Sequence, residues 1–269
     1  MIVEKITMLG NGAAMVTKCY NTCFTISDSE EYFLVDTGGG NTILSNLEKK
    51  NIEINKIHNV FISHSHNDHI MGIVWIIRAV CQKIIDGKYE DNLNIYSHNK
   101  NIEIIKTISK LLLQNKFTKY LDNRIKFIPV EDKSSLEVLG WKMDFFDIRS
   151  TKLLQFGFEI SLISGKKFVF LGDEPFNENL TDYAYKCDYL MHEAFCLYSE
   201  KEKFKPYEKH HSTVKDACIN ASKLGVKNVI LIHTEDKNLD NRKNLYSQEG
   251  KNYFSGNIIV PDDLEEIIL

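Results

Sequence analysis

The chain has 269 residues, of which 43% are hydrophobic and 26% are charged, a balance typical of a globular protein with a sizeable core. Its 33 lysines and arginines against 37 aspartates and glutamates give a net charge of −4, which argues against a generally basic nucleic-acid-binding protein. The longest apolar stretch, residues 70–81, contains Arg78 and is far shorter than the roughly 20 residues of a membrane-spanning helix. Residues 1–6 do not resemble a signal peptide, so we expect a cytoplasmic protein without a membrane partner.

The six cysteines are scattered along the chain, and no two of them form a CxxC pair. Zinc-finger and thioredoxin-like chemistry need closer pairing. We therefore expect reduced and mostly buried thiols, which fits the cytoplasm.

Short runs of β-branched, aromatic and aliphatic residues predict strands along most of the chain. In chain order these runs are Ile2–Met8, Thr22–Ser27, Tyr32–Val35, Asn59–Ser63, Leu93–Ser97, Ile125–Val130, Lys142–Ile148, Phe156–Ile163, Lys167–Leu171, Tyr189–His192, Asn228–Ile232 and Asn257–Val260. Apolar residues at helical spacing predict helices between several of the strands. The predicted helices are Thr42–Lys50, Ile70–Ile85, Asn101–Leu113, Asn179–Tyr185, Thr213–Leu224 and Asp240–Tyr253.

The order of these elements indicates the fold class. A group of strands without helices is followed by strands that alternate with helices, and this pattern occurs twice along the chain. Such an order favours an α/β sandwich, with two mixed β-sheets inside and helices outside, over a single doubly wound sheet. Because no linker or internal repeat stands out, we predict one domain over residues 1–269.

The loop after the strand at 59–63 carries four side chains of metal-ligand type within six residues: His64, His66, Asp68 and His69. On an extended backbone His64 and His66 point the same way, while Asp68 and His69 follow the turn and can aim at a neighbouring point. Imidazole and carboxylate ligands suit Zn, Fe or Mn, with two metals about 3.5–4 Å apart as one arrangement. The alternative is a solvated histidine-rich turn, which four such residues at a strand-to-helix junction argue against.

This HxHxDH pattern resembles the signature of the metallo-β-lactamase superfamily. The resemblance implies a four-layer αββα sandwich and further site residues along the chain. Asp173, in the FLGD segment at 170–173, is similar to the aspartate that bridges both metals. His233, after the apolar run 229–232, is similar to the last ligand, and Asp36 to the residue that supports the ligand loop.

Two further segments resemble the ribonuclease Z-like branch of this superfamily. The HEA motif is met at 192–194 and the HST motif at 211–213. The resemblance implies that His211 lies beside the scissile phosphate as general acid or oxyanion donor, oriented by Glu193. The HST segment also opens a predicted helix, so Ser212 or Thr213 could cap it, and both interpretations can hold together. Lys237 is where the branch tends to carry a phosphate-contacting arginine; a solvated surface lysine is the alternative.

The chain departs from the family between the first motif and the bridging aspartate, because no histidine occurs from residue 99 to 173. Arg149, or Thr151 with a small gap, takes the place of the expected ligand. Arg149 is a permanent cation, so we expect it either to pair with Asp173 in competition with a metal or to turn outward toward an anionic substrate.

Two zinc sites follow from the resemblance, with Mn or Fe as alternatives. One would keep His64, His66 and Asp173 without the missing ligand, and the other Asp68, His69, Asp173 and His233. The protein is then expected to hold one or two ions.

A second departure concerns the substrate. Residues 164–166 alone connect the predicted strands at 158–163 and 167–171, which leaves no room for the arm by which ribonuclease Z enzymes grip tRNA. The net charge of −4 also argues against tRNA. A small phosphodiester or a short nucleic acid is the expected substrate.

The sequence therefore predicts a metal-dependent phosphodiesterase or small nuclease that uses metal-bound hydroxide, with Asp68 orienting the hydroxide or taking its proton. Two alternatives keep the same fold: a lactone or thioester hydrolase, and a non-catalytic binding protein that lost its metal through Arg149. Family analogy alone suggests a homodimer.

Overall fold

The computed structural model describes residues 3–28 and 31–269, and these residues form two compact units. The first unit contains residues 3–10, 20–131 and 264–268, and the second contains residues 11–19, 132–263 and 269. Each unit has its own seven-stranded sheet within the described part of the chain. The prediction of a single domain stays a prediction.

The sheet of the first unit has the strand order β14-β1-β2-β3-β4-β5-β6. Its antiparallel part is β14, β1, β2 and β3, and its parallel part is β3, β4, β5 and β6. The strands are β1 (Lys5–Gly10), β2 (Cys23–Ser27), β3 (Tyr32–Val35), β4 (Asn59–Phe61), β5 (Leu93–Ser97), β6 (Ile125–Pro129) and β14 (Glu266–Ile268).

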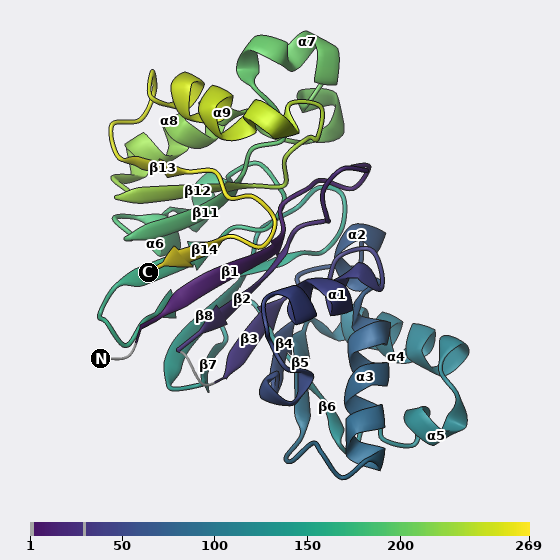
Figure 1. Ribbon diagram of the computed structural model, residues 1–269. Helices are drawn as coiled ribbons and strands as arrows, with labels where there is room; N and C mark the ends of the chain where they lie inside the picture. The colour runs from purple at the N-terminus through teal and green to yellow at the C-terminus, as the bar shows by residue number, and fades with distance from the viewer. Residues whose placement is uncertain (1–2, 29–30) are drawn as a thin grey trace. The chain divides into compact units, whose positions relative to one another are not determined.

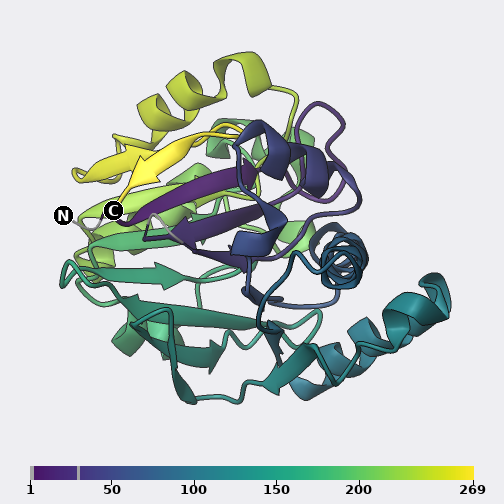
Figure 2. The same cartoon turned by 60° about the horizontal axis from the view of Figure 1, so that its bottom comes forward.

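Helices of the first unit pack on one face of this sheet. They are α1 (Thr42–Lys49), η1 (Ile54–Lys56), α2 (Asn67–Ile70), α3 (Ile73–Ile85), α4 (Asn99–Leu112) and α5 (Asn115–Thr118). Figures 1 and 2 both show α3 and α4 side by side on the flank of β4, β5 and β6. Their apolar side chains, such as Ile76, Ile77 and Ile105, are fully buried against Val60 and Ile95 in one cluster. This cluster anchors the end of β4, where the predicted ligand loop begins.

The helix predicted over Ile70–Ile85 is interrupted, which corrects the sequence-based boundaries. Two helices, α2 and α3, take its place, with Met71 and Gly72 between them. A Cβ atom at Gly72 would lie 2.0 Å from the Thr37 carbonyl oxygen, so only glycine allows this close approach. Gly72 N also donates to the Gly38 carbonyl at 3.0 Å. The break therefore fastens the ligand loop to the neighbouring loop after β3.

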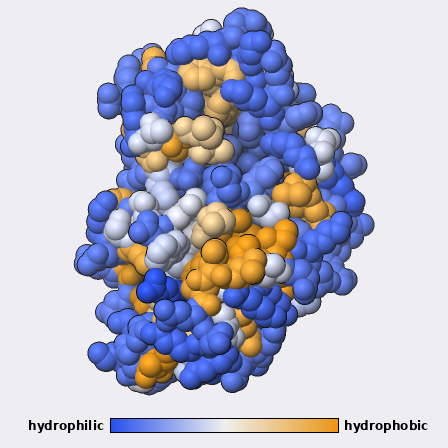
Figure 3. Space-filling model, turned by 90° about the vertical axis from the view of Figure 1, so that its right-hand side faces the viewer, coloured by the Kyte–Doolittle hydropathy of each residue, from blue (hydrophilic) through white to orange (hydrophobic). Residues whose placement is uncertain are grey.

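The first unit also exposes an apolar patch over α3 and α4. Figure 3 shows an orange patch on this side of the molecule. Met71, Trp75 and Leu113 are among the residues that line a cavity beside α3 and α4. Leu111 and Leu112 at the end of α4 are 77% and 62% exposed. Exposed apolar surface of this kind is common at interaction sites.

The sheet of the second unit has the order β13-β12-β11-β10-β9-β8-β7, parallel from β13 to β10 and antiparallel from β10 to β7. The strands are β7 (Ser135–Val138), β8 (Trp141–Asp147), β9 (Phe156–Ser161), β10 (Lys167–Phe170), β11 (Tyr189–Glu193), β12 (Asn228–Ile232) and β13 (Asn257–Ile259). The helical segments are η2 (Glu178–Leu180), α6 (Thr181–Ala184), η3 (Tyr198–Glu200), α7 (Lys201–Phe204), η4 (Tyr207–Lys209), α8 (Val214–Leu224), η5 (Leu239–Asn241) and α9 (Arg242–Gly250). A buried cluster containing Val214, Ala217, Leu231 and Tyr246 joins α8 and α9 to this sheet.

These elements confirm the predicted α/β class with two mixed sheets and helices. Two short strands were missed, β7 and β14, while the predicted first strand began at Ile2, which lies outside the described residues. The short connection predicted at residues 164–166 is a hairpin turn, because β9 and β10 pair antiparallel and Leu162 N donates to the Lys166 carbonyl at 2.9 Å. None of the helices in the described ranges has the length and apolar character needed to cross a bilayer.

Candidate functional site

The predicted ligand loop of the first unit gathers its histidines at the end of β4. His64 Nε2 and His66 Nδ1 lie 2.9 Å apart, and the rings of His64 and His69 have their centroids 4.3 Å apart. His69 Nε2 lies 3.3 Å from Asp68 Oδ2. All of these side chains except the half-buried His66 are nearly inaccessible to solvent. The structure thus brings together the four ligand-type residues that the sequence placed in one loop.

Asp36 organises this loop from the end of β3. Its carboxylate accepts hydrogen bonds from Ser63 N at 2.8 Å, from Ser63 Oγ at 2.7 Å and from His69 Nδ1 at 2.8 Å. Since the Ser63 hydroxyl donates to Asp36, the 2.9 Å contact between Ser63 Oγ and His64 Nδ1 requires His64 Nδ1 to be the donor. Asp36 therefore holds, directly or through Ser63, the Nδ1 protons of His64 and His69, so that Nε2 is the atom of each ring that a metal would take.

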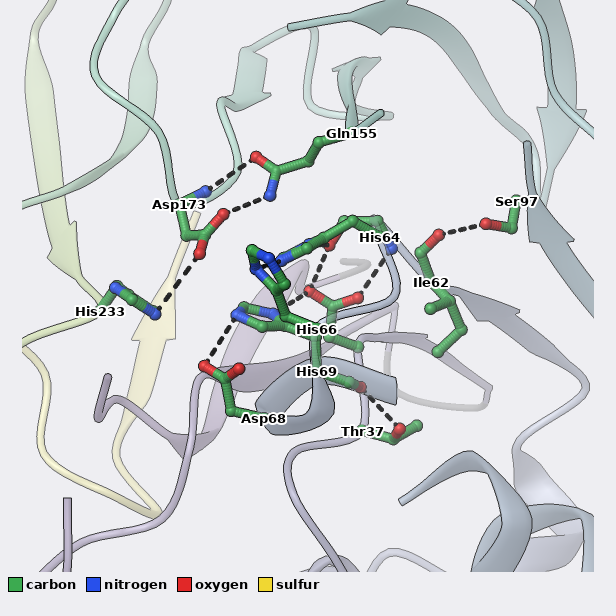
Figure 4. A network of polar contacts seen from close by, with 12 residues as sticks. Thr37, Ile62, His64, His66, Asp68, His69, Ser97, Gln155, Asp173 and His233 are labelled. Atoms are coloured by element: carbon green, nitrogen blue, oxygen red, sulfur yellow. Dashed lines mark hydrogen bonds and ion pairs between the residues drawn. The ribbon is translucent and has the colours of Figure 1, made fainter. Parts of the chain in front are cut away.

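The backbone around Asp36 and His69 supports the same orientation. Asp36 has φ 53, a left-handed conformation that aspartate tolerates better than most residues. Thr37 donates to the His69 carbonyl from both its N and its Oγ1, each at 2.9 Å, and Figure 4 shows the second of these contacts. The pKa of His69 reflects this setting: burial alone would lower it, but the carboxylates of Asp68 and Asp36 raise it well above its ordinary value.

In the second unit, Asp173 and His233 form a separate pair. His233 Nε2 lies 3.6 Å from Asp173 Oδ2, and both side chains are almost fully buried. His233 follows β12 with φ 56, an uncommon conformation for a histidine and one often found at functional sites. Thr234 N donates to the Asn11 carbonyl at 3.0 Å and so holds the backbone directly after His233.

Gln155 is the side chain that holds Asp173. Its Nε2 donates to Asp173 Oδ1, and its Oε1 accepts from Asp173 N at 3.4 Å (Figure 4). A Cβ atom at Gly172, where φ is 74, would come within 2.5 Å of Gln155 Oε1. Sequence reasoning missed this residue; the signal was a single amide side chain among apolar neighbours just before β9.

The expectation that Arg149 pairs with Asp173 is wrong. Its guanidinium contacts Asp132 Oδ2 at 2.8 Å and Asp147 Oδ2 at 3.2 Å, and its side chain is 51% exposed. Arg149 has φ 61, and Arg149 N donates to Asp147 Oδ1 at 2.8 Å. This tight turn directs the side chain to nearby aspartates on the surface.

Glu193 and His211 adjoin each other as predicted for an orienting carboxylate and its histidine. Glu193 Oε2 lies 3.5 Å from His211 Nδ1, and Glu193 Oε1 accepts from Ser212 N. Glu193 is fully buried, whereas His211 keeps a partly exposed ring. The His211 ring packs against Phe195 and His233, with centroids 5.3 and 5.0 Å away. Glu193, His211 and His233 also have ligand atoms within 4.8 Å of one another.

The helix-capping interpretation of the HST segment holds beside this arrangement. Thr213 is the N-cap of α8 and forms a capping box with Asp216. The cap therefore uses the side chains of Thr213 and Asp216, and the His211 ring takes no part in it. His192 of the HEA segment is a core histidine, since its Nδ1 contacts the Glu193 carbonyl at 2.7 Å, and burial lowers its pKa.

Lys237 lies at the surface of the second unit. Its side chain is 59% exposed and pairs with Asp236 Oδ1 at 3.2 Å. Both interpretations of Lys237, a phosphate contact and a solvated lysine, stay predictions.

The chain is similar to curated relatives and to solved structures over nearly its whole length. A ribonuclease Z of Methanococcus aeolicus is 28% identical, covering 97% of this chain and 96% of the relative. The metallo-β-lactamase fold protein YhfI of Bacillus subtilis has a TM-score of 0.82 at 19% identity, covering 99% and 100% of the two chains. The short form of human tRNase Z has a TM-score of 0.73 at 20% identity, covering 98% of each chain.

These likenesses confirm the predicted αββα fold class of the metallo-β-lactamase superfamily and the resemblance to its ribonuclease Z-like branch. A family model also matches residues 4–254, and its description is "Anti-Pycsar protein Apyc1".

Proposed function

This chain belongs to the family of the anti-Pycsar protein Apyc1, and from this membership, its ribonuclease Z relatives and its site we propose that it is a metal-dependent hydrolase of phosphodiesters. The observation that carries the proposal is the organisation of the HxHxDH loop by Asp36. A buried carboxylate that fixes the tautomers of two histidines is the usual outer shell of a metal site. A solvated histidine-rich turn would need no such support.

The donor set fits a divalent metal, and we propose zinc, with Mn or Fe as alternatives. The proposed ligands are those implied by the family motifs: His64, His66, Asp68, His69, Asp173 and His233. When bound, the metal supplies Lewis acidity, which polarises the phosphodiester and makes water a nucleophile near neutral pH. We propose that one or two ions bind, with one position lacking the histidine that the family resemblance implies.

The protein's own side chains would manage the protons and the substrate. We propose that Asp68 orients the attacking water and takes its proton. His211, held by Glu193, would donate a hydrogen bond or a proton to the leaving oxygen. Lys237 would attract the phosphate as a point charge. Arg149 has no part in this proposal, because two aspartates hold its guanidinium.

A small phosphodiester or a short nucleic acid is the proposed substrate. The short turn between β9 and β10 and the net charge of −4 both argue against tRNA. A homodimer is a further proposal, supported by the apolar patch over α3 and α4.

We also propose that the protein works in the cytoplasm, where its six thiols would stay reduced.

The decisive experiment measures metal and activity on one preparation. Elemental analysis gives the metal and its equivalents per chain, and hydrolysis is followed with bis(p-nitrophenyl) phosphate, cyclic nucleotides, a lactone and a thioester. Turnover of a phosphodiester that chelation abolishes and zinc restores is the expected result. Turnover of only the lactone or thioester, or no bound metal and no turnover, would refute the proposal. Sedimentation of the wild type and of Leu111→Lys tests the dimer.

A further inference from the structure

Three side chains of metal-ligand type meet within the second unit. Glu193 ends β11, His211 lies in the segment before α8, and His233 follows β12. Strands β11 and β12 pair in parallel with Glu193 opposite Ile232, so the register sets Glu193 and His233 at neighbouring strand ends. One ligand atom of each of the three residues lies within 4.8 Å of the other two. The fold of this unit alone thus assembles a candidate metal site.

The spacing of Glu193 and His211 suits a shared metal better than a direct hydrogen bond. Glu193 Oε2 lies 3.5 Å from His211 Nδ1, whereas an N–H···O hydrogen bond measures about 2.7–3.2 Å. Zinc binds imidazole nitrogen and carboxylate oxygen at about 2.0–2.2 Å, and two such ligands at a tetrahedral angle are then roughly 3.3–3.6 Å apart. The two atoms therefore stand at the separation that one zinc ion requires.

The protein satisfies only one oxygen of the Glu193 carboxylate. This side chain is fully buried, and its Oε1 accepts a hydrogen bond from Ser212 N. Within residues 3–28 and 31–269, neither Glu193 Oε2 nor His211 Nδ1 has a hydrogen-bond partner. A buried carboxylate oxygen without a hydrogen bond is costly. A divalent cation between the two atoms would compensate both of them.

The charges around the cluster also favour a cation. Asp173 Oδ2 lies 3.6 Å from His233 Nε2, which brings a second buried carboxylate close. Lys152 reaches the segment before α8, but Glu174 Oε1 pairs with its ammonium at 3.1 Å. Lys209 of that segment is exposed, so solvent screens its charge. The carboxylates therefore dominate the local field.

His211 is the side of the cluster that solvent reaches. Its side chain is 13% exposed, whereas the side chains of Glu193 and His233 are 0% and 2% exposed. An ion can therefore enter past the His211 ring. A zinc ion with three protein ligands can take a water molecule as the fourth, and the exposed edge leaves room for it.

We propose that Glu193, His211 and one nitrogen of His233 form a second kind of metal site, the Glu193–His211 site, in which zinc inhibits the enzyme. As a general acid, His211 donates a proton from its doubly protonated ring. A zinc ion on one ring nitrogen excludes that form, because an imidazolium ring has no nitrogen left to bind a metal. The zinc binding stands on the geometry alone, whereas the inhibition rests on the proposed phosphodiesterase function.

The first measurement is the number of zinc ions bound per chain as free zinc is raised. Protein that holds its resident metal is dialysed against buffers of increasing free zinc, and elemental analysis compares the protein with the dialysate. The wild type should take up one equivalent beyond the resident metal. Hydrolysis of bis(p-nitrophenyl) phosphate should fall in step with the occupancy of that added equivalent.

Glu193→Gln and His211→Ala are the variants that should lose the added zinc. Glutamine can still accept from Ser212 N but offers no carboxylate, and alanine removes the imidazole from the partly exposed position 211. The affinity for the added zinc should fall at least about 10-fold in each, since even the loss of an outer-shell partner has an effect of that size. The resident metal should stay at its wild-type amount, because neither residue is among its proposed ligands.

His210→Asn is the matched control. It removes the exposed histidine next to His211, and asparagine tolerates the left-handed backbone at φ 55. Its added zinc equivalent and its inhibition by zinc should match those of the wild type. If Glu193→Gln does not fold, His211→Ala decides the test alone, since its side chain is partly exposed.

The outcomes separate this site from the proposed function. No added equivalent in the wild type, or one that both variants keep, would overturn the Glu193–His211 site. An added equivalent that depends on Glu193 and His211 but leaves hydrolysis unchanged would overturn the inhibition. Wild-type protein with neither resident metal nor hydrolysis would refute the proposed function, while the zinc titration of the variants still decides the Glu193–His211 site.

Discussion

The ligand loop of the first unit and the segment from Asp147 to Glu174 of the second unit hold their candidate site residues in different ways. In the loop, residues 63–69 are contiguous, and one buried carboxylate, Asp36, orients them. In the second segment, Gln155 reaches Asp173 across 18 positions, while Arg149 turns to its local partners Asp132 and Asp147. In a short motif the positions of the side chains follow from neighbouring residues. Where the side chains come from distant residues, their positions depend on strand register and on turns.

The largest expected effect on bound metal and on hydrolysis comes from a substitution in the ligand loop. His66→Ala removes an imidazole that faces His64 Nε2 at 2.9 Å, so bound metal should fall by most of one equivalent and phosphodiester hydrolysis by at least about 100-fold. Elemental analysis and initial rates on the same preparations measure both. His58→Ala, a histidine of the same unit that contacts the Tyr89 ring, is the control and should change neither. A His66→Ala variant with full metal and full activity would remove the loop from the site.

Asp36→Asn tests whether one carboxylate organises the loop. Asparagine tolerates the left-handed backbone at φ 53 but can no longer accept all of the hydrogen bonds from Ser63 and His69. We expect metal affinity to fall by about 10- to 100-fold, since outer-shell partners have effects of that size. Competition with a fluorescent zinc chelator gives the affinity. Unchanged affinity would mean that the histidines keep their orientation without Asp36.

Gln155→Ala tests whether Asp173 of the second unit depends on the side chain that holds it. The variant leaves a buried Asp173 carboxylate without its amide donor, which should cost about 1–3 kcal/mol of unfolding free energy and lower activity by about 10-fold. Urea unfolding and steady-state rates measure the two effects. Gln248→Ala, an exposed glutamine on α9, is the matched control. Equal behaviour of the two variants would show that Asp173 does not depend on Gln155.

The sequence predicted the fold and the loop well because both are encoded locally. Apolar periodicity located β3, β5 and β12 at their observed bounds, and the spacing of His64, His66, Asp68 and His69 predicted one cluster. Other features depend on distant parts of the chain. The short strand β14 forms only by pairing with β1, and the break at Gly72 results from its close approach to Thr37. Gln155 was missed for the same reason, since nothing near it in sequence indicates Asp173.

A smaller effect concerns residues 13–18, whose backbone is held by Asp236 through Thr17 N and Lys18 N. Hydrogen bonds from Thr17 N and Lys18 N and the Lys237 ammonium outweigh the effect of burial and lower the pKa of Asp236 from 3.8 to about 2. A carboxyl pKa that is lower in the folded state stabilises the fold above about pH 4 and loses that contribution as the pH falls through 2. Asp236→Asn should therefore cost about 1–2 kcal/mol of unfolding free energy at pH 7, and the difference from wild type should shrink below pH 4.

Urea unfolding of Asp236→Asn and wild type at pH 7, 4 and 3 measures this difference. The exposed Asp240→Asn serves as the control. A deficit that is the same at all three pH values would show that packing, rather than the charge of Asp236, holds residues 13–18.

The smallest expected effect is that of Arg149→Ala, and it distinguishes the two accounts of the second segment. If Arg149 occupied the position of the missing ligand, removing its positive charge would relieve repulsion and raise the bound metal. In the structure the guanidinium is half exposed and pairs with Asp132 and Asp147, and surface pairs of this kind contribute about 0–1 kcal/mol. Metal content and hydrolysis should therefore stay at wild-type values, with at most a slight loss of stability. Elemental analysis of Arg149→Ala beside Gln155→Ala distinguishes the two accounts. A gain of bound metal in the arginine variant would mean that Arg149 reaches Asp173. A loss of metal in the glutamine variant alone would mean that Gln155, and not Arg149, affects the metal through Asp173.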